Sequence, residues 1–301
     1  MDRRTGSTKL RPVSLPAGVL LLAIVLAGCA GQPGTGPKLN WNYFFDTLFR
    51  PDDRIRFGIW LTLSIAILSQ FIGVVLGTFA ALGKMAKPWP VRSIANLYIW
   101  LFRGTPLVVQ IVLFYFGLSV ARIYAWPTVE VPGASIDGAI QAGVFALGVN
   151  EGAYFAEIVR AGILSIDPGQ TEAGKALGMT YGLIMRRIVL PQAARVIVPP
   201  LGNEFNNMLK TTSLLVLISV PELYTIVNRK QGNAFAPFEF YLAAAVWYLL
   251  MTTIWSVIQA RIEHRLAKGT TGASAGPSLR DRLFGVGSSP TEGLPRITGG
   301  R

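Results

Sequence analysis

The chain has 301 residues, of which 51% are hydrophobic and only 15% are charged. Soluble domains carry about 25% charged residues, so this composition, with a mean hydropathy of +0.44, excludes an ordinary soluble protein and indicates an integral membrane protein. The net charge of +12 does not indicate nucleic-acid binding, because the basic residues gather in short connections between apolar runs. A single cysteine, Cys29, and a single histidine, His264, exclude an intrachain disulfide and a thiolate metal cluster, and we expect no metal or other cofactor.

The segment 1–36 has the layout of a secretory signal, with a basic start and an apolar run over 15–27. The residues Leu26-Ala27-Gly28-Cys29 resemble a bacterial lipobox, in which Cys29 would be lipidated and become the new N-terminus. The alternative is an uncleaved anchor helix, although a run of about 13 residues is short for a hydrocarbon core of about 30 Å. Both interpretations place the chain outside the cell from Gln32 onward.

Five apolar segments predict five core transmembrane helices and hence an all-α membrane domain over 41–268. They cover approximately 57–82, 94–120, 138–160, 196–220 and 241–259. The stretches 122–137 and 222–239 are predicted to be external loops. Residues 269–301 are rich in Gly, Ser, Thr and Pro, which predicts a disordered cytoplasmic tail.

Two of these segments are interrupted, and one contains a glycine pair. Arg103 and Gly104-Thr105-Pro106 interrupt the second segment, and Pro199-Pro200 and then Lys210-Thr211-Thr212 break the fourth. Gly73 and Gly77 in the first segment form a small-xxx-small pair that would let another helix approach closely. The alternative is that glycine is simply common in membrane helices.

Polar side chains at membrane depth occur in the third and fourth segments. They are Asn150, Glu151 and Glu157, followed by Asn203, Glu204, Asn207 and Lys210. Burying a carboxylate in a bilayer costs several kcal/mol unless it is paired or faces water, and interrupted helices often present polar groups to a substrate. These seven residues are candidates for lining a substrate path. The alternative is that they hold the spans together, for example through a Glu157–Arg160 pair.

Charge placement predicts the orientation. Starting outside, five crossings put the 84–92 turn, the 160–195 connection and the C-terminus in the cytoplasm. These segments are basic, as the positive-inside rule requires, whereas the two external loops carry only Arg122, Arg229 and Lys230. The exception is a basic group at 50–56, which Asp52 and Asp53 offset.

The stretch 166–191, IDPGQTEAGKALGMTYGLIMRRIVLP, is a polar and basic island between apolar segments. It predicts two short helices, the first beginning at Asp167-Pro168 and separated by Gly178 from a second that Pro191 ends. The spacing of Gly169 and Gly174-Lys175 approaches a phosphate-binding loop. The next residue is Ala176, however, where Mg²⁺ needs a hydroxyl. We therefore expect that this chain does not bind a nucleotide.

The spacing within this island is specific. Glu172-Ala173-Gly174, three residues, Gly178, nine residues, Ile188, one residue and Leu190-Pro191 resemble the EAA signature of the membrane subunits of bacterial ABC importers. The wider text over 150–214, together with FRGTPLVVQ at 102–110, resembles the polar amino acid permeases, and the resemblance covers roughly 56–268. Gly174 replaces the usual Ala, which should loosen the helix by ~1 kcal/mol. Thr211 stands where the family usually has an acidic residue.

The resemblance implies a type I ABC importer permease in the bacterial inner membrane, a transport subunit and not an enzyme. An extracytoplasmic binding protein would deliver a small polar amino acid. The loop at about 161–191 would form a coupling helix to which separate ATPase subunits bind. Five spans in lipid are too few to enclose a path, so a second permease copy or a sister subunit is implied. An ordinary solvated loop is the alternative for the island. An ion-coupled secondary amino acid carrier is the alternative for the whole chain, although no internal repeat supports it.

Overall fold

The computed structural model describes residues 39–131 and 134–267, and the helices and strands lie in a unit that begins at Asn40. The predictions for the signal-like segment, for lipidation of Cys29 and for the tail over 269–301 fall outside these residues.

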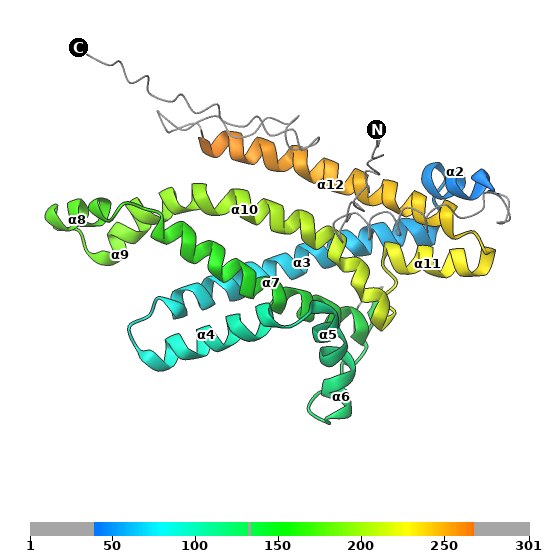
Figure 1. The fold of residues 1–301 in the computed structure, drawn as a ribbon, viewed down its shortest axis with the longest axis horizontal. Coiled ribbons are helices and arrows are strands. Elements are labelled where there is room, and N and C mark those ends of the chain that lie inside the picture. Colours follow the sequence, from blue (N-terminus) through cyan, green and yellow to red (C-terminus); the bar gives the residue numbers. More distant parts are fainter. Residues whose placement is uncertain (1–38, 132–133, 268–301) are drawn as a thin grey trace, which may run out of the picture. The chain divides into compact units, whose positions relative to one another are not determined.

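The described chain is mainly helical (Figure 1). The long helices are α3 (Asp53–Lys84), α4 (Trp89–Gly104), α7 (Gly138–Leu164), α10 (Leu190–Thr211) and α12 (Pro237–Ala267). The shorter helices are α2 (Trp41–Phe49), α5 (Leu107–Val112), α6 (Leu118–Val120), α8 (Pro168–Ala176), α9 (Tyr181–Ile184) and α11 (Leu223–Ala234). Two π-helical turns, η1 (Leu113–Gly117) and η2 (Met185–Val189), and the 3₁₀ helix η3 (Thr212–Ile218) connect them. The first predicted external loop contains a small antiparallel hairpin, β1 (Val129–Val131) and β2 (Ala134–Ile136).

The five predicted spans correspond to α3, α4 to α6, α7, α10 with η3, and α12. By length and apolarity, α3 and α12 each suffice to cross a membrane, and two bent pairs qualify if each is one span: α4 with α5–α6, bent by 106°, and the 181–218 stretch with α11, bent by 53°. Helix α7 has 27 residues and is about 40 Å long. It falls short of the same apolarity because it carries three of the polar residues predicted at membrane depth.

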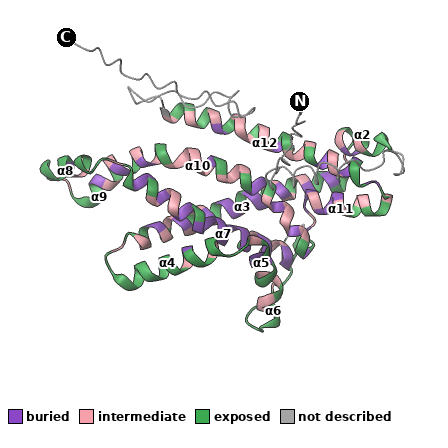
Figure 2. Ribbon diagram, viewed as in Figure 1, coloured by how far each residue is buried: buried purple, intermediate pink, exposed green. Residues whose placement is uncertain are grey.

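Helix α7 is enclosed by its neighbours, and α3 lies along it. Figure 2 shows the middle of α7 mostly buried, with buried positions of α3 beside it. A Cβ atom at Gly77 would lie 2.7 Å from the Gly152 carbonyl oxygen and 2.8 Å from the Cβ of Phe155, and one at Gly73 would meet the Glu151 side chain at 2.6 Å. The glycine pair of the first span therefore serves close helix contact, as one of the two interpretations predicted.

Three apolar clusters hold the helices together. The first joins α3, α5, α7, α10 and η3 around Ile65, Leu147 and Leu215; the second joins α3, α4, α7, α9 and α10; the third joins α3, α11 and α12. Outward faces of α3, α4 and α12 expose large apolar side chains, among them Trp60, Phe71, Phe79, Trp100 and Leu249. Such continuous apolar faces suit contact with lipid hydrocarbon.

The prediction of an external loop at 222–239 was wrong about its secondary structure, because this segment contains helix α11. The fully buried Glu222 caps this helix, accepting hydrogen bonds from the backbone N–H of Thr225 at 2.7 Å and from the hydroxyls of Tyr248 at 2.8 Å and Thr62 at 3.3 Å. A buried carboxylate is tolerated when donors surround it. The polar composition of α11 favoured a loop, but this cap ties the helix to α3 and α12.

Three prolines predicted to end or break helices, Pro191 and the Pro199-Pro200 pair, do neither. The second island helix continues through η2 into α10, where Pro191 occupies the first turn, and α10 passes unbroken through Pro199-Pro200. Proline is compatible with a first turn, where its missing N–H has no helical partner to lose. Proline within a membrane helix is tolerated where neighbouring helices support it, and α12 contacts this part of α10 through a 3.1 Å hydrogen bond from Gln259 to the Pro199 carbonyl. The predicted break at 210–212 is present, as the change from α10 to η3.

The basic group at 50–56 is offset in part as predicted. Arg56 contacts Asp53 at 3.3 Å, while Asp52 instead accepts a 2.6 Å bond from Lys230 of α11. Burial alone would raise the pKa of Asp52, but Lys230 and the Ile55 N–H lower the pKa below its usual value. This exposed pair links the start of α3 to α11.

We predict that Gly77→Ala lowers the free energy of unfolding by about 1–3 kcal/mol, because the new methyl group forces α3 away from the α7 backbone. Thermal unfolding in detergent measures the change. The matched control is Gly232→Ala, whose added Cβ meets nothing within 4 Å. Equal unfolding temperatures for the two variants would show that α3 and α7 do not pack as described.

Candidate functional site

The second predicted span turns sharply at residues 103–106, here called the elbow. Helix α4 ends at Gly104, α5 begins at Leu107, and their directions differ by 106°. Pro106 has no N–H to continue the helix, and it restricts the residue before it to extended backbone. Thr105 accordingly has φ −117° and ψ 145°. The break predicted from Arg103-Gly104-Thr105-Pro106 is therefore present, as a change of direction.

Two buried amide side chains hold the elbow. Gln110 of α5 donates from Nε2 to the Phe102 carbonyl at 2.9 Å, to the Thr105 carbonyl at 3.1 Å and to the Thr105 hydroxyl at 2.8 Å. Asn150 of α7 donates from Nδ2 to the same Phe102 carbonyl at 3.2 Å and to Gln110 Oε1 at 3.0 Å. The pair of amides, here called the amide clamp, thus replaces helical hydrogen bonds that the elbow cannot make.

A cavity of about 460 Å³ lies beside the elbow, between α7 and α10. It brings together four of the seven residues predicted to line a path, namely Asn150, Glu151, Glu204 and Asn207. It also includes Arg103 and Tyr154. Three segments that are distant in the sequence therefore converge on one polar cavity.

The cavity wall carries both signs of charge. Glu151 is 6% exposed and accepts a 3.2 Å hydrogen bond from Gln70 of α3, and Glu204 is half-buried on α10. The Arg103 guanidinium lies over the Tyr154 ring, 5.3 Å from its centroid, a distance at which cation–π attraction operates. One cation and two carboxyl groups therefore face a shared space.

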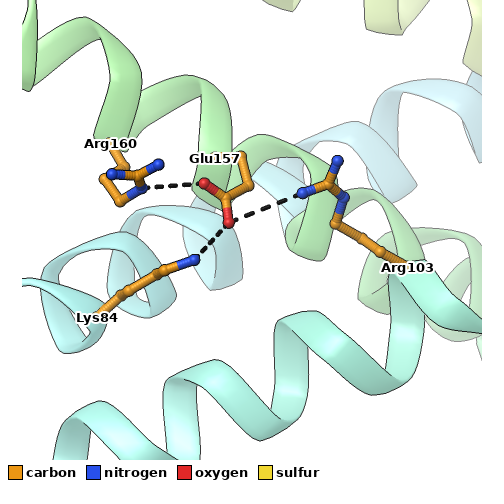
Figure 3. A network of polar contacts seen from close by, with 4 residues as sticks. All are labelled: Lys84, Arg103, Glu157 and Arg160. Atoms are coloured by element: carbon orange, nitrogen blue, oxygen red, sulfur yellow. Dashed lines mark hydrogen bonds and ion pairs between the residues drawn. The ribbon is translucent and has the colours of Figure 1, made fainter.

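Glu157 does not line this cavity but lies in an ion-pair cluster at the end of the helices (Figure 3). Its carboxylate contacts Lys84 at 2.6 Å, Arg160 at 3.0 Å and Arg103 at 3.7 Å. The Glu157–Arg160 pair was predicted, whereas the contacts from α3 and α4 join residues 54 and 73 positions away in the sequence. One anion therefore ties three helices together and retains Arg103 near the cavity.

The two other predicted path residues lie elsewhere. Asn203 accepts a 3.2 Å bond from Gln259 of α12, and Lys210 borders a second cavity of about 460 Å³ with tyrosines of α11 and α12. Sequence reasoning missed Arg103, Tyr154 and Gln110 as members of the site. The FRGTPLVVQ stretch contains two of them and carried the signal, because a charge followed by Gly-Thr-Pro inside an apolar run marks a break that needs partners.

The island folds as a capped helix and a tight turn. Asp167 caps α8, accepting a 2.8 Å bond from the Gly169 N–H, as predicted. At the other end the Met179 N–H donates to the Gly174 carbonyl at 3.1 Å and the Gly178 N–H to the Lys175 carbonyl at 2.9 Å, which is a Schellman motif. Gly178 has φ +76°, a left-handed conformation that favours glycine. The predicted turn at Gly178 therefore has a specific hydrogen-bonded form.

The packing of the island gives a reason for Gly174, which stands where the EAA pattern usually has Ala. Gly174 is buried, and an added Cβ would lie 2.9 Å from Ile184 Cγ1 and 3.3 Å from Ile188 Cδ1. Glycine here lets α8 approach α9 and η2 closely. This close packing offsets the lower helix propensity of glycine. Glu172 and Ala173 are exposed, as are Leu190 and Pro191, while the most prominent apolar side chains are Leu177, 81% exposed, and Tyr181, 67% exposed.

Comparison with known proteins decides the family. Residues 73–268 match the model of the binding-protein-dependent transport system inner membrane component. The chain belongs to this family. The permease is 39% identical over 262 residues to the arginine transport system permease protein ArgU of Corynebacterium glutamicum, covering 84% of this chain and 79% of ArgU. It is 36% identical over 209 residues to the glutamine transport system permease protein GlnP of Escherichia coli, covering 69% of this chain and 91% of GlnP.

Solved structures agree with this assignment. A crystal structure of an amino acid ABC transporter with histidines resembles the permease with a TM-score of 0.67 and 37% identity, covering 76% of this chain and all of that chain. A methionine ABC transporter shares the fold at a TM-score of 0.58 and 18% identity, covering 71% of this chain and 96% of that chain. The permease therefore has the predicted type I fold and is the transport component of an ABC importer, which places it in the inner membrane.

We predict that Glu157→Gln lowers the free energy of unfolding by about 1–3 kcal/mol, less than for a fully buried pair because Glu157 is 21% exposed. The three cations would lose their shared anion and repel one another. Thermal unfolding in detergent is the measurement. Asp53→Asn, which breaks the exposed pair with Arg56, is the control and should change stability by no more than about 1 kcal/mol. Equal effects of both variants would contradict the cluster's role.

Proposed function

We propose that the permease imports a polar amino acid through the elbow cavity, driven by ATPase subunits that dock on the island. The observation that carries the proposal is the convergence of Arg103, Glu151 and Glu204 on one cavity in a permease of this family. Relatives of this chain are named as arginine and glutamine transport permeases, so an amino acid is the natural occupant of such a cavity.

The charge pattern favours a cationic member of this class. The guanidinium of Arg103 is suited to an α-carboxylate, and two carboxyl groups, Glu151 and Glu204, are suited to an α-ammonium group and a second positive charge. A neutral amino acid would leave one carboxyl group without a counter-charge, which is costly in a low-dielectric site. The side chains Asn150 and Asn207 add polar surface to the same wall.

The exposed tip of the island fits the role of the ATPase-docking element. Leu177 and Tyr181 are the most exposed large side chains of a segment whose Ile184, Ile188 and Val189 pack inward, and exposed large side chains on a rigid support are typical of binding hot spots. Glu172 is exposed on the same segment and is available to a basic partner surface. The docking residues proposed from the EAA pattern thus divide into exposed ones and, at Gly174 and Ile188, supporting ones.

The orientation follows from the same proposal. The α3–α4 turn, the island and the end of α12 lie together at one end of the described helices, and α2 and α11 lie at the other (Figure 1). We place the basic island end in the cytoplasm, where the ATPases are, and the α2 end outside, where a solute-binding protein delivers substrate. A second permease copy or a sister subunit completes the path, since the few spans of one chain cannot enclose it in lipid.

We predict that Leu177→Ala weakens ATPase association by about tenfold and lowers uptake in parallel, because it truncates an exposed anchor without removing a fold contact. Co-purification with the ATPase and uptake in proteoliposomes measure both effects. Leu249→Ala, at a position 65% exposed on α12, is the matched control and should leave both unchanged. Normal ATPase binding by Leu177→Ala would contradict docking at this tip.

We predict that Glu204→Gln lowers arginine uptake about tenfold more than glutamine uptake, because the variant keeps its shape and loses a negative charge. Competition between the two labelled amino acids in proteoliposomes with saturating binding protein gives the ratio directly. Glu130→Gln, on the exposed strand β1, should leave the ratio unchanged. An unaltered ratio in Glu204→Gln would remove the elbow cavity as the site of charge recognition.

A further inference from the structure

We infer that Gln110 and Asn150 are positioning residues, which keep the second span bent so that Arg103 faces the substrate. This inference rests on the proposed function of the elbow cavity. It assigns Asn150, predicted to line the path, to the support of the elbow, and it gives a transport role to Gln110, which lies behind the cavity wall and is 4% exposed.

The bend cannot persist in a bilayer without partners for its backbone. The chain between α4 and α5 leaves the helical path at Thr105 and Pro106, and hydrocarbon supplies no water for the released groups. The Phe102 carbonyl receives both Gln110 and Asn150, and the Thr105 carbonyl receives Gln110. The amide clamp therefore satisfies the two carbonyls that flank the turn.

The clamp is also self-consistent. Thr105 accepts from Gln110 at its hydroxyl oxygen and donates the hydroxyl hydrogen to the Leu101 carbonyl at 2.8 Å, so the hydrogen-bond chain runs on into α4. Gln110 Oε1 is satisfied in turn by Asn150 Nδ2 at 3.0 Å. Both amides are at most 9% exposed. A network of buried polar groups with matched donors and acceptors specifies one arrangement more strongly than apolar packing does.

The elbow places Arg103 at the junction of three contacts. As part of the last turn of α4, Arg103 reaches the Tyr154 ring at 5.3 Å and Glu157 at 3.7 Å, and it borders the cavity. Extending α4 straight through 103–106 would carry the following residues away from α7 and close the space that α5 now leaves open. Loss of the clamp should therefore disturb the cavity without altering any charged side chain.

The decisive experiment measures the bend and transport in the same variants. In a Cys29→Ser background, Ile94 and Val120 are each replaced by cysteine and spin-labelled. Both side chains are strongly exposed. A straight helix would separate residues 94 and 120 by about 39 Å, whereas a bend of 106° brings them to about 24 Å. Pulsed electron–electron double resonance in proteoliposomes resolves this difference in distance.

Gln110→Met keeps the length of the side chain and removes the hydrogen bonds that Gln110 makes to Phe102, Thr105 and Asn150, leaving only the bond from Asn150 to the Phe102 carbonyl. We expect a broadened distance distribution that extends toward 39 Å, together with a loss of uptake of about tenfold or more. Asn150→Ala leaves the bonds from Gln110 to the elbow in place and should give a smaller shift and a smaller loss; it carries the test if Gln110→Met does not fold. Gln141→Met is the matched control, because Gln141 lies on α7 but donates to the Pro127 carbonyl outside the cavity.

Each result decides the inference. An unchanged distance distribution in Gln110→Met and Asn150→Ala overturns the clamp, whatever the uptake. A changed distribution with normal uptake shows that the bend has no part in transport and overturns the positioning role. An increased KM for Asn150→Ala with an unchanged distance would make Asn150 a direct substrate contact instead. Failure of the cavity itself is detected separately by the arginine-to-glutamine ratio of Glu204→Gln, which does not depend on the bend.

Discussion

Backbone hydrogen bonding in hydrocarbon is the constraint on which this structure depends. A membrane segment can leave the helical path only where other groups replace the bonds it gives up. The elbow at 103–106 meets this condition through two amides contributed by α5 and α7. On the positioning role proposed for the two amides, loss of that replacement would let the second span straighten and would change both the cavity and the position of Arg103.

The two carboxylates of α7 also differ in how many partners surround them. Glu151 and Glu157 are six residues apart on one helix, yet their surroundings differ. Glu157 lies near the helix end among three cations, where it ties α3, α4 and α7 together. Glu151 receives a hydrogen bond from Gln70 and faces the cavity, and no cationic side chain among the described residues forms an ion pair with it. A buried carboxylate with few partners marks a place where a ligand is expected to supply them.

Much of the fold was predictable, because long apolar runs and basic connections are properties of local sequence. The spans, the island with its Asp167 cap and the turn at Gly178 belong to this group. Proline was misleading at 191 and 199–200, since its effect depends on whether it occupies a first turn and on which neighbours compensate. Gln110 and Arg103 could not be assigned partners from the sequence, because Asn150 and Glu157 reach them only through the packing of α4 and α5 on α7.

Packing also suggests how motion at the island would reach the cavity. The second apolar cluster runs without interruption from Ile184, which contacts Gly174 of α8, through Ile163 and Phe155 of α7 to Ile99 of α4. Close-packed interiors transmit displacement because their side chains have few alternative positions. A force applied at the island would therefore move α4 and α7 together. The elbow lies at the end of α4, where the chain changes direction into α5. Since continuous apolar packing connects the island to α4 and α7, the elbow would be the place where such a movement changes the cavity.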